Sequence, residues 1–168
     1  MLHEVHFSAD HQATPEAKEC AAGALVNLSA DPANRQALVA AGVHNPLSAL
    51  LSDPQATAEA KEWAAGALEK LSRDLANHPT LMAAGVDNPL SALLIDPQAT
   101  AEAKQNAAGA LCHLSADPAN RQALVAAGVH NPLSALLIDP QATARAREWA
   151  AVALRHLTPT PRGCCVIS

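Results

Sequence analysis

Four cysteines and eight histidines are the residues of this 168-residue chain best suited to covalent or metal chemistry. The most specific pattern is Cys165-Val-Ile-Ser168 at the end of the sequence, which has the form of a C-a-a-X box. In such a box a transferase joins a prenyl group to the cysteine thiol, and a final serine favours farnesyl. The sequence therefore predicts farnesylation of Cys165, unless the match is a coincidence or the natural chain continues further.

A second membrane signal is expected beside this box, because one prenyl chain holds a membrane only weakly. Cys164 is a candidate for palmitoylation and equally an ordinary free thiol. The chain has a net charge of −5, yet residues 145–168 carry four arginines and one acid. Basic residues favour an anionic membrane surface. We therefore expect the protein in the cytoplasm of a eukaryotic cell, at the cytosolic face of a membrane once it is prenylated.

Other chemistry is poorly supported. His3, His6 and His11 precede Cys20, but no second cysteine stands at zinc spacing, and His3-Glu-Val-His6 is one residue short of a zincin motif. We expect no metal, cofactor or small-molecule substrate. Cys112 and His113 are neighbours in sequence, and adjacent residues of a helix do not face each other. No phosphate loop or nucleophile elbow is present, so we expect no enzyme.

The overall charge and hydropathy exclude further classes. A net negative chain without a basic run is a poor binder of nucleic acid. No apolar run approaches the ~20 residues that span a bilayer, and the N-terminus does not resemble a signal peptide. These observations indicate a cytosolic protein with reduced cysteines.

The composition specifies the elements that must position these residues. Hydrophobic residues make up 49% of the chain and aromatic residues 2%, with 40 alanines and 22 leucines. Alanine and leucine are strong helix formers, whereas the residue types typical of strands are scarce. The sequence predicts an all-α fold in which helices approach closely.

A repeat of 43 residues organises the chain. Residues 31–51 recur letter for letter at 117–137, and a diverged version lies at 74–94. We expect a solenoid domain over residues 1–158 and a flexible Pro-rich tail with the C-a-a-X box over 159–168. The domain divides into a partial repeat, 1–30, and three full repeats, 31–73, 74–116 and 117–158.

Three helices are expected in each repeat, exemplified by 32–41, 46–52 and 54–72. Asp31, Asn45 and Asp53 each precede a proline, which suits an N-cap followed by the first helical residue. Gly42 suits the left-handed position that ends a helix. Apolar stripes at helical spacing predict the buried sides: Leu47, Leu50 and Leu51 in the second helix, and Ala60, Ala64, Ala67, Leu68 and Leu71 in the third. No unit can bury its stripe alone, so the units must stack.

The motifs Ala-Ala-Gly-Ala-Leu-x-x-Leu-Ser, Asn-Arg-x-x-Leu-Val-x-Ala-Gly-Val and Pro-Leu-x-x-Leu-Leu resemble the armadillo repeat over residues 12–158. The resemblance implies a right-handed superhelix whose third helices line a concave groove for extended peptides or partner helices. HEAT repeats are the nearest rival, but they have two helices per unit. The resemblance also implies a ladder of groove tryptophans and asparagines. Here glycine or valine stands at the tryptophan positions, and only Asn27 matches an asparagine position.

Both tryptophans nevertheless fall on the expected groove side. Residues at offsets of 4, 7 and 11 lie on one side of a helix. The resulting candidate partner-binding residues are Asn27, Glu59, Trp63, Gly66, Lys70, Asn106, Gly109, His113, Trp149 and His156. The tryptophans are either anchors for a partner, beside glycines that admit its backbone, or caps of the seam between repeats. Glu16, Glu59 and Glu102 either attract a basic ligand or merely favour the helix dipole.

The expected function is a non-enzymatic adaptor that binds a peptide or helix of a protein partner and is tethered to a membrane. Three alternatives remain open. The first is a regulatory chaperone or exchange factor for lipidated small GTPases. The second is a solenoid enzyme subunit that uses Cys20 or Cys112. The third is a folded product of repeat duplication without a dedicated partner.

Overall fold

The computed structural model describes residues 14–158, which form ten α-helices and one short 3₁₀-helix, with no strand in that range. The all-α prediction is therefore confirmed. The predictions for His3, His6, His11, Cys164, Cys165 and the C-a-a-X box lie outside the described residues. The helices are α1 (Pro15–Ala30), α2 (Pro32–Ala40), α3 (His44–Ser52), α4 (Ala58–Leu71), η1 (Leu75–Asn77), α5 (His78–Ala83), α6 (Asp87–Ile95), α7 (Ala101–Ala116), α8 (Pro118–Ala126), α9 (His130–Ile138) and α10 (Ala144–Leu157).

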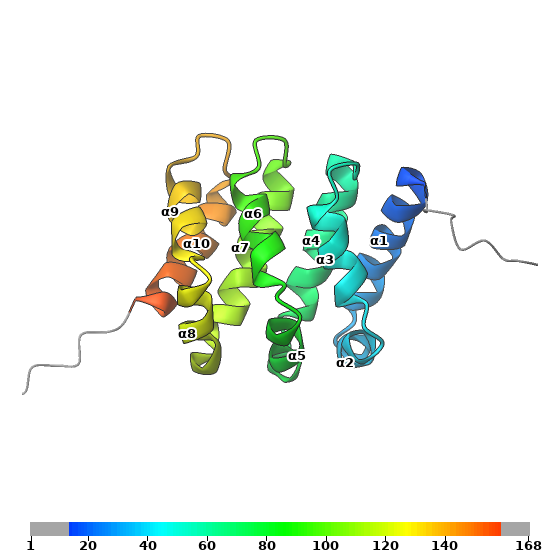
Figure 1. The fold of residues 1–168 in the computed structure, drawn as a ribbon, viewed down its shortest axis with the longest axis horizontal. Helices are drawn as coiled ribbons and strands as arrows, with labels where there is room; N and C mark the ends of the chain where they lie inside the picture. The colour runs from blue at the N-terminus through cyan, green and yellow to red at the C-terminus, as the bar shows by residue number, and fades with distance from the viewer. Residues whose placement is uncertain (1–13, 159–168) are drawn as a thin grey trace, which may run out of the picture.

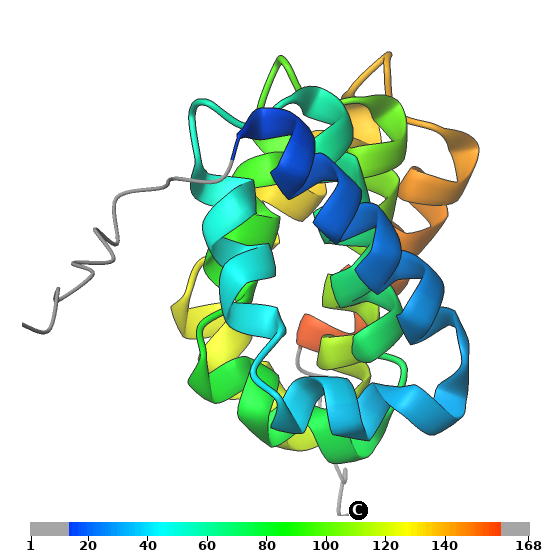
Figure 2. The same ribbon diagram turned by 90° about the vertical axis from the view of Figure 1, so that its right-hand side faces the viewer.

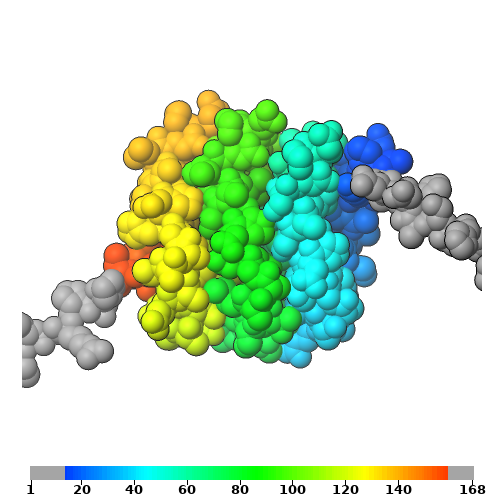
Figure 3. Space-filling view, in the orientation of Figure 1, coloured from blue at the N-terminus to red at the C-terminus, as the bar shows by residue number. Residues whose placement is uncertain are grey.

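The helices stack in a right-handed solenoid, one repeat beside the next (Figure 1). Seen along the row from its N-terminal end, the helices occupy three positions around the cross-section (Figure 2). Third helices pack on third helices, α1 on α4, α4 on α7 and α7 on α10, while α3, α6 and α9 form a second layer. In the space-filling view the repeats of this second layer run as parallel bands across the molecule (Figure 3).

The third helix of each repeat begins later than the sequence suggested. The prediction of 54–72 was wrong at its start, because α4 begins at Ala58. The Asp53 carboxylate accepts the Gln55 N–H at 2.8 Å and so closes a turn instead of capping a helix. Thr57 is the actual N-cap, its hydroxyl accepting the Ala60 N–H at 3.0 Å, a contact worth about 1 kcal/mol. The same threonine cap opens α1, α7 and α10.

The predicted start of the second helix was also wrong. The helix α3 begins at His44, with Val43 as its N-cap residue, so Asn45 is already helical. The Asp31 cap is confirmed, since its carboxylate accepts the Ala33 N–H at 3.0 Å. Gly42 has φ of +79°, the left-handed conformation expected where the first helix ends.

The middle repeat has an irregular first helix because of one proline. Pro79 has no backbone N–H to donate to the Leu75 carbonyl, so the turn before it lacks one α-helical hydrogen bond. The segment consequently starts as η1, and α5 is only six residues long. The corresponding helices α2 and α8 each run for nine residues from a proline at their first position.

The core consists mainly of alanine and leucine, as the stripes predicted. Leu47, Leu50 and Leu51 are buried, as are Ala60, Ala64, Ala67, Leu68 and Leu71. Fully buried alanines recur along α4, α7 and α10, which lets these helices pack closely. None of the helices in residues 14–158 is both long and apolar enough to cross a membrane.

Polar contacts repeat from unit to unit and lock the stacking. Asn34, Asn77 and Asn120 each donate to a carbonyl at the end of the preceding third helix, at 3.0–3.1 Å. Buried carbonyls need such partners where a helix ends. Lysine–aspartate pairs join successive repeats: Lys18–Asp53 at 2.7 Å, Lys61–Asp96 at 3.4 Å and Lys104–Asp139 at 2.8 Å.

Candidate functional site

The third-helix face, made by the outward sides of α1, α4, α7 and α10, carries the residues that the sequence singled out. Asn27, Glu59 and Trp63 are exposed there. Lys70, Asn106, His113, Trp149 and His156 are half-buried. Gly66 and Gly109 are buried. The face is therefore a strip of polar and aromatic side chains over a floor of small residues.

The two tryptophans have different environments. The ring of Trp149 packs against the core, lies 5.3 Å from the ring of His113, and has the Arg145 guanidinium 4.6 Å from its centroid. Trp63 is 41% exposed, and no aromatic or cation–π contact involves it among the described residues. The difference follows from the residue one turn earlier: Arg145 can stack on the ring of Trp149, whereas Glu59, at the corresponding position in α4, is acidic.

The two buried glycines make room for side chains of neighbouring repeats. A Cβ placed on Gly66 would lie 3.2 Å from Asn106 Nδ2 and 3.6 Å from Val26 Cγ2. A Cβ placed on Gly109 would lie 3.0 Å from Glu69 Cγ and 3.6 Å from Trp149 Nε1. The space over these glycines is taken by this chain's own side chains, not left open for the backbone of a partner. Gly23 has nothing within 4 Å of the equivalent atom.

Glu69 holds the most connected polar cluster of this face, and sequence reasoning missed it. Its carboxylate accepts two bonds from the Arg73 guanidinium at 3.0 Å and lies 3.2 Å from His113 Nε2. Burial by itself raises the pKa of Glu69, but the hydrogen bonds from His113 and Arg73 outweigh it, and the pKa lies below its ordinary value of 4.5. The sequence did contain a signal for this cluster, because Glu69 is an acid at a position that Val26 and Cys112 occupy in the neighbouring repeats.

Cys112 is buried in the core between repeats. Burial raises the pKa of its thiol to about 11, against a small opposing effect of Arg155. A nucleophilic cysteine needs the opposite shift, toward the thiolate. The geometry therefore gives no support to the alternative in which Cys112 is a catalytic nucleophile.

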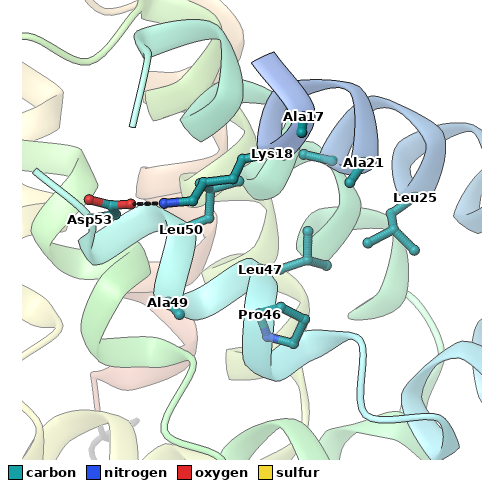
Figure 4. Close-up of a pocket in the computed structure, with 10 residues that line it drawn as sticks. Ala17, Lys18, Ala21, Leu25, Pro46, Leu47, Ala49, Leu50 and Asp53 are labelled. Atoms are coloured by element: carbon teal, nitrogen blue, oxygen red, sulfur yellow. Dashed lines mark hydrogen bonds and ion pairs between the residues drawn. The ribbon is translucent and has the colours of Figure 1, made fainter. Parts of the chain in front are cut away.

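An apolar pocket of about 340 Å³ lies between α1 and α3, and the sequence analysis did not anticipate it. Leu25, Leu47 and Leu50 line it, and the Lys18–Asp53 ion pair lies at its edge (Figure 4). In the later repeats α3, α6 and α9 pack on the third helix of their own unit. The described residues contain no helix that packs on α1 as α3 packs on α4, so the pocket stays open.

Comparison with known proteins places the fold. Neither a protein-family model nor a curated protein sequence matches the chain. Among solved structures, a designed armadillo repeat protein superposes with a TM-score of 0.77 at 28% identity, covering 88% of this chain. A computationally designed armadillo repeat protein for modular peptide recognition gives 0.78 at 29% identity, covering 87%. A third, in complex with peptide (KR)4, gives 0.76 at 24% identity.

These matches show that the chain has the fold of an armadillo-repeat solenoid. The chain spans 61% and 60% of the length of the first two neighbours.

Proposed function

We propose that the protein is a non-enzymatic scaffold whose third-helix face binds an extended peptide or a single helix of a protein partner. The exposed ring of Trp63 is the observation that carries this proposal. A large aromatic side chain left 41% exposed on a rigid helix is a typical anchor for a partner. A structural neighbour designed for modular peptide recognition supports the same use of this fold.

The site is centred on Trp63 and not shared equally by the two tryptophans. The ring of Trp149 already has Arg145 on it and His113 beside it. Around Trp63, Glu59 is exposed on the same helix, and Glu102 is exposed at the equivalent position of α7. The partner is therefore expected to place a side chain on the ring of Trp63, next to carboxylates that favour a basic segment.

Selection from a displayed peptide library against the full chain tests this proposal. In a Trp149→Phe background Trp63 is the sole tryptophan, so its fluorescence reports directly on contact with a selected peptide. We expect a shift of its emission on binding and, in Trp63→Ala, an affinity at least ~10-fold lower, the effect of a strong anchor residue. Ile138→Ala is the matched control, because Ile138 is an apolar side chain 84% exposed on α9. Equal affinity of Trp63→Ala and the control would refute the site.

We also propose that the scaffold is tethered to the cytosolic face of a membrane by a farnesyl group on Cys165. The support is the Cys165-Val-Ile-Ser168 pattern and the excess of arginine near it. The proposal requires that Ser168 is the natural C-terminal residue.

Expression of the chain in eukaryotic cells tests the tether by intact mass and membrane fractionation. For the wild-type chain we expect the added mass of one farnesyl group and recovery of the protein in the membrane fraction. Cys165→Ser should lose both, whereas Cys164→Ser should keep the farnesyl mass. A wild-type chain without added lipid mass, wholly in the soluble fraction, would contradict the tether and leave the peptide proposal untouched.

A further inference from the structure

A basic cleft of about 560 Å³ lies at the C-terminal end of the solenoid, away from Trp63. It opens between α8 and the last turn of α10. Its described lining consists of Arg121, Gln122, Val125, Arg155, His156, Leu157 and Thr158, and no acidic residue is among them. Two guanidinium groups and an imidazole therefore share one concave surface without a carboxylate to balance them.

Arg121 is held in place and still has donors to spare. Its Nε donates to the Ser115 carbonyl at 3.1 Å and its Nη2 to the Ala116 carbonyl at 3.1 Å. A guanidinium has five N–H groups, so three remain. Arg155 is exposed and forms no ion pair with the described residues. The cleft thus presents unused N–H donors from one anchored guanidinium group, that of Arg121, and from one that is unpaired within the described chain, that of Arg155.

His156 completes the cluster with a defined orientation. The Ser115 hydroxyl donates its single hydrogen to the Cys112 carbonyl at 2.9 Å, so it accepts from His156 Nδ1 at 3.1 Å. The second ring nitrogen, Nε2, is left without a partner among the described residues. Burial lowers the pKa of His156, and the charges of Arg121 and Arg155 lower it further. An anion in the cleft would relieve this repulsion.

The other repeats provide an internal comparison. The position of Arg155 is occupied by Val26, Glu69 and Cys112 in the earlier third helices. At Glu69 the repeat carries its own carboxylate, which pairs with Arg73 and His113. The excess of positive charge is therefore specific to the last repeat and is not a consequence of the solenoid geometry.

We propose that this cleft binds a phosphate group, held by the guanidinium groups of Arg121 and Arg155, with the Nε2–H of His156 as a further donor once the bound anion has favoured protonation of the ring. Arginine matches phosphate oxygens with paired N–H donors, and charge-assisted bonds of this kind are among the stronger hydrogen bonds in proteins. The phosphate belongs either to a small phosphorylated compound or to the headgroup of an anionic phospholipid. The chemistry of recognition is the same for both.

NMR of the His156 ring in the full chain tests the site with inorganic phosphate at constant ionic strength. We expect a saturable shift of the ring signals and a rise in the pKa of His156, because a bound anion favours the protonated ring. Arg155→Gln should weaken binding at least ~10-fold, as expected for loss of a charge-assisted contact. Arg147→Gln is the charge-matched control on the same helix and should bind as the wild type does.

A second pair of variants separates binding from folding at Arg121. Arg35 makes the same two bonds in the first full repeat, to the Ser29 and Ala30 carbonyls at 3.0 and 3.2 Å. Arg35→Gln and Arg121→Gln should therefore cost similar stability, while only Arg121→Gln weakens phosphate binding. Equal phosphate affinity in both variants would overturn the proposed role of Arg121.

Vesicles distinguish the two sources of the phosphate. Phosphatidylcholine vesicles with and without an anionic phospholipid are used with the Cys165→Ser chain, which cannot be prenylated at the box. Binding to anionic vesicles that Arg155→Gln loses and Arg147→Gln keeps assigns the site to a lipid headgroup. Binding of inorganic phosphate alone assigns it to a small compound. If neither probe shows binding that depends on Arg155, the proposal is wrong, and the peptide site at Trp63 is unaffected.

Discussion

Gly23, Gly66 and Gly109 stand at equivalent positions of three third helices, so replacing each with alanine is a controlled probe of packing between repeats. Alanine in place of glycine inside a helix gains about 1 kcal/mol from backbone entropy alone. A Cβ on Gly23 meets nothing within 4 Å. Gly23→Ala should therefore raise the free energy of unfolding by about 1 kcal/mol, or ~2–4 °C in melting temperature for a chain of this size.

At Gly109 the added methyl group meets an obstacle that cannot easily move. Its distance to Glu69 Cγ would be 3.0 Å, and the Glu69 carboxylate is tied to Arg73 and His113. Overpacking of this kind costs about 1–3 kcal/mol, which exceeds the gain in helix propensity. Gly109→Ala should therefore destabilise the protein by about 1 kcal/mol. The change in stability for Gly66→Ala should lie between those for Gly23→Ala and Gly109→Ala. The nearest atom to its added methyl group belongs to Asn106, whose side chain forms no hydrogen bond with the described residues.

Chemical denaturation followed by circular dichroism measures the three changes under one set of conditions. The decisive comparison repeats Gly109→Ala in a Glu69→Ala background, where the obstacle is absent and the gain of about 1 kcal/mol should return. The reasoning is refuted if Gly109→Ala stabilises the wild-type chain as much as Gly23→Ala does. That result would mean that Glu69 does not close over Gly109.

Three further outcomes are expected. Trp149→Ala should lower the free energy of unfolding by about 2 kcal/mol, because the ring of Trp149 packs on the core. Trp63→Ala should change it by less than about 1 kcal/mol, because the ring of Trp63 is more exposed, and thermal melts compare the two. The pKa of Glu69 is lower in the folded state, so its carboxylate stabilises the fold fully above the ordinary pKa of 4.5. This contribution is lost as the pH falls through the folded-state pKa. In unfolding experiments at decreasing pH, the stability difference between the wild type and Glu69→Gln should therefore shrink. With the two C-terminal cysteines replaced by serine, a thiol reagent at pH 8 should label Cys20 rapidly and Cys112 only on unfolding, because Cys112 is buried and its pKa is raised to about 11.

The repeat, the helical class and the buried stripes could all be derived from the sequence because each depends on local properties. Helix propensity belongs to single residues, and the apolar spacing of Leu47, Leu50 and Leu51 specifies one buried side. The residues at which the helices start were harder to predict. Asp53 and Asn45 each precede a proline, and both looked like caps, but Asp53 closes a turn and Asn45 lies inside α3. Thr57, four residues after Asp53, is by type a slightly weaker cap than aspartate, and only the geometry of the turn selects it.

The candidate site was only partly accessible to sequence reasoning. The stripe with Trp63 and Trp149 could be placed on one side of the third helices, because that requires only helical periodicity. The sequence shows Arg145 one turn before Trp149 and Glu59 one turn before Trp63. It does not show that the ring of Trp149 lies against His113 of the preceding repeat, because that contact depends on how the repeats stack.

What the sequence determined by itself is therefore the unit: its length, its three helices and the side that each helix buries. What only the tertiary structure decided is which side chains of different helices meet, between units for Glu69 over Gly109, and within the last unit for Arg121 beside Arg155 and His156. The physical reason is that near-identical units have near-identical local energetics, whereas a contact between side chains of two helices depends on substitutions at positions that lie far apart in the chain. The Glu69 cluster and the basic cleft both arise at such contacts, at positions where one copy of the repeat differs from the next.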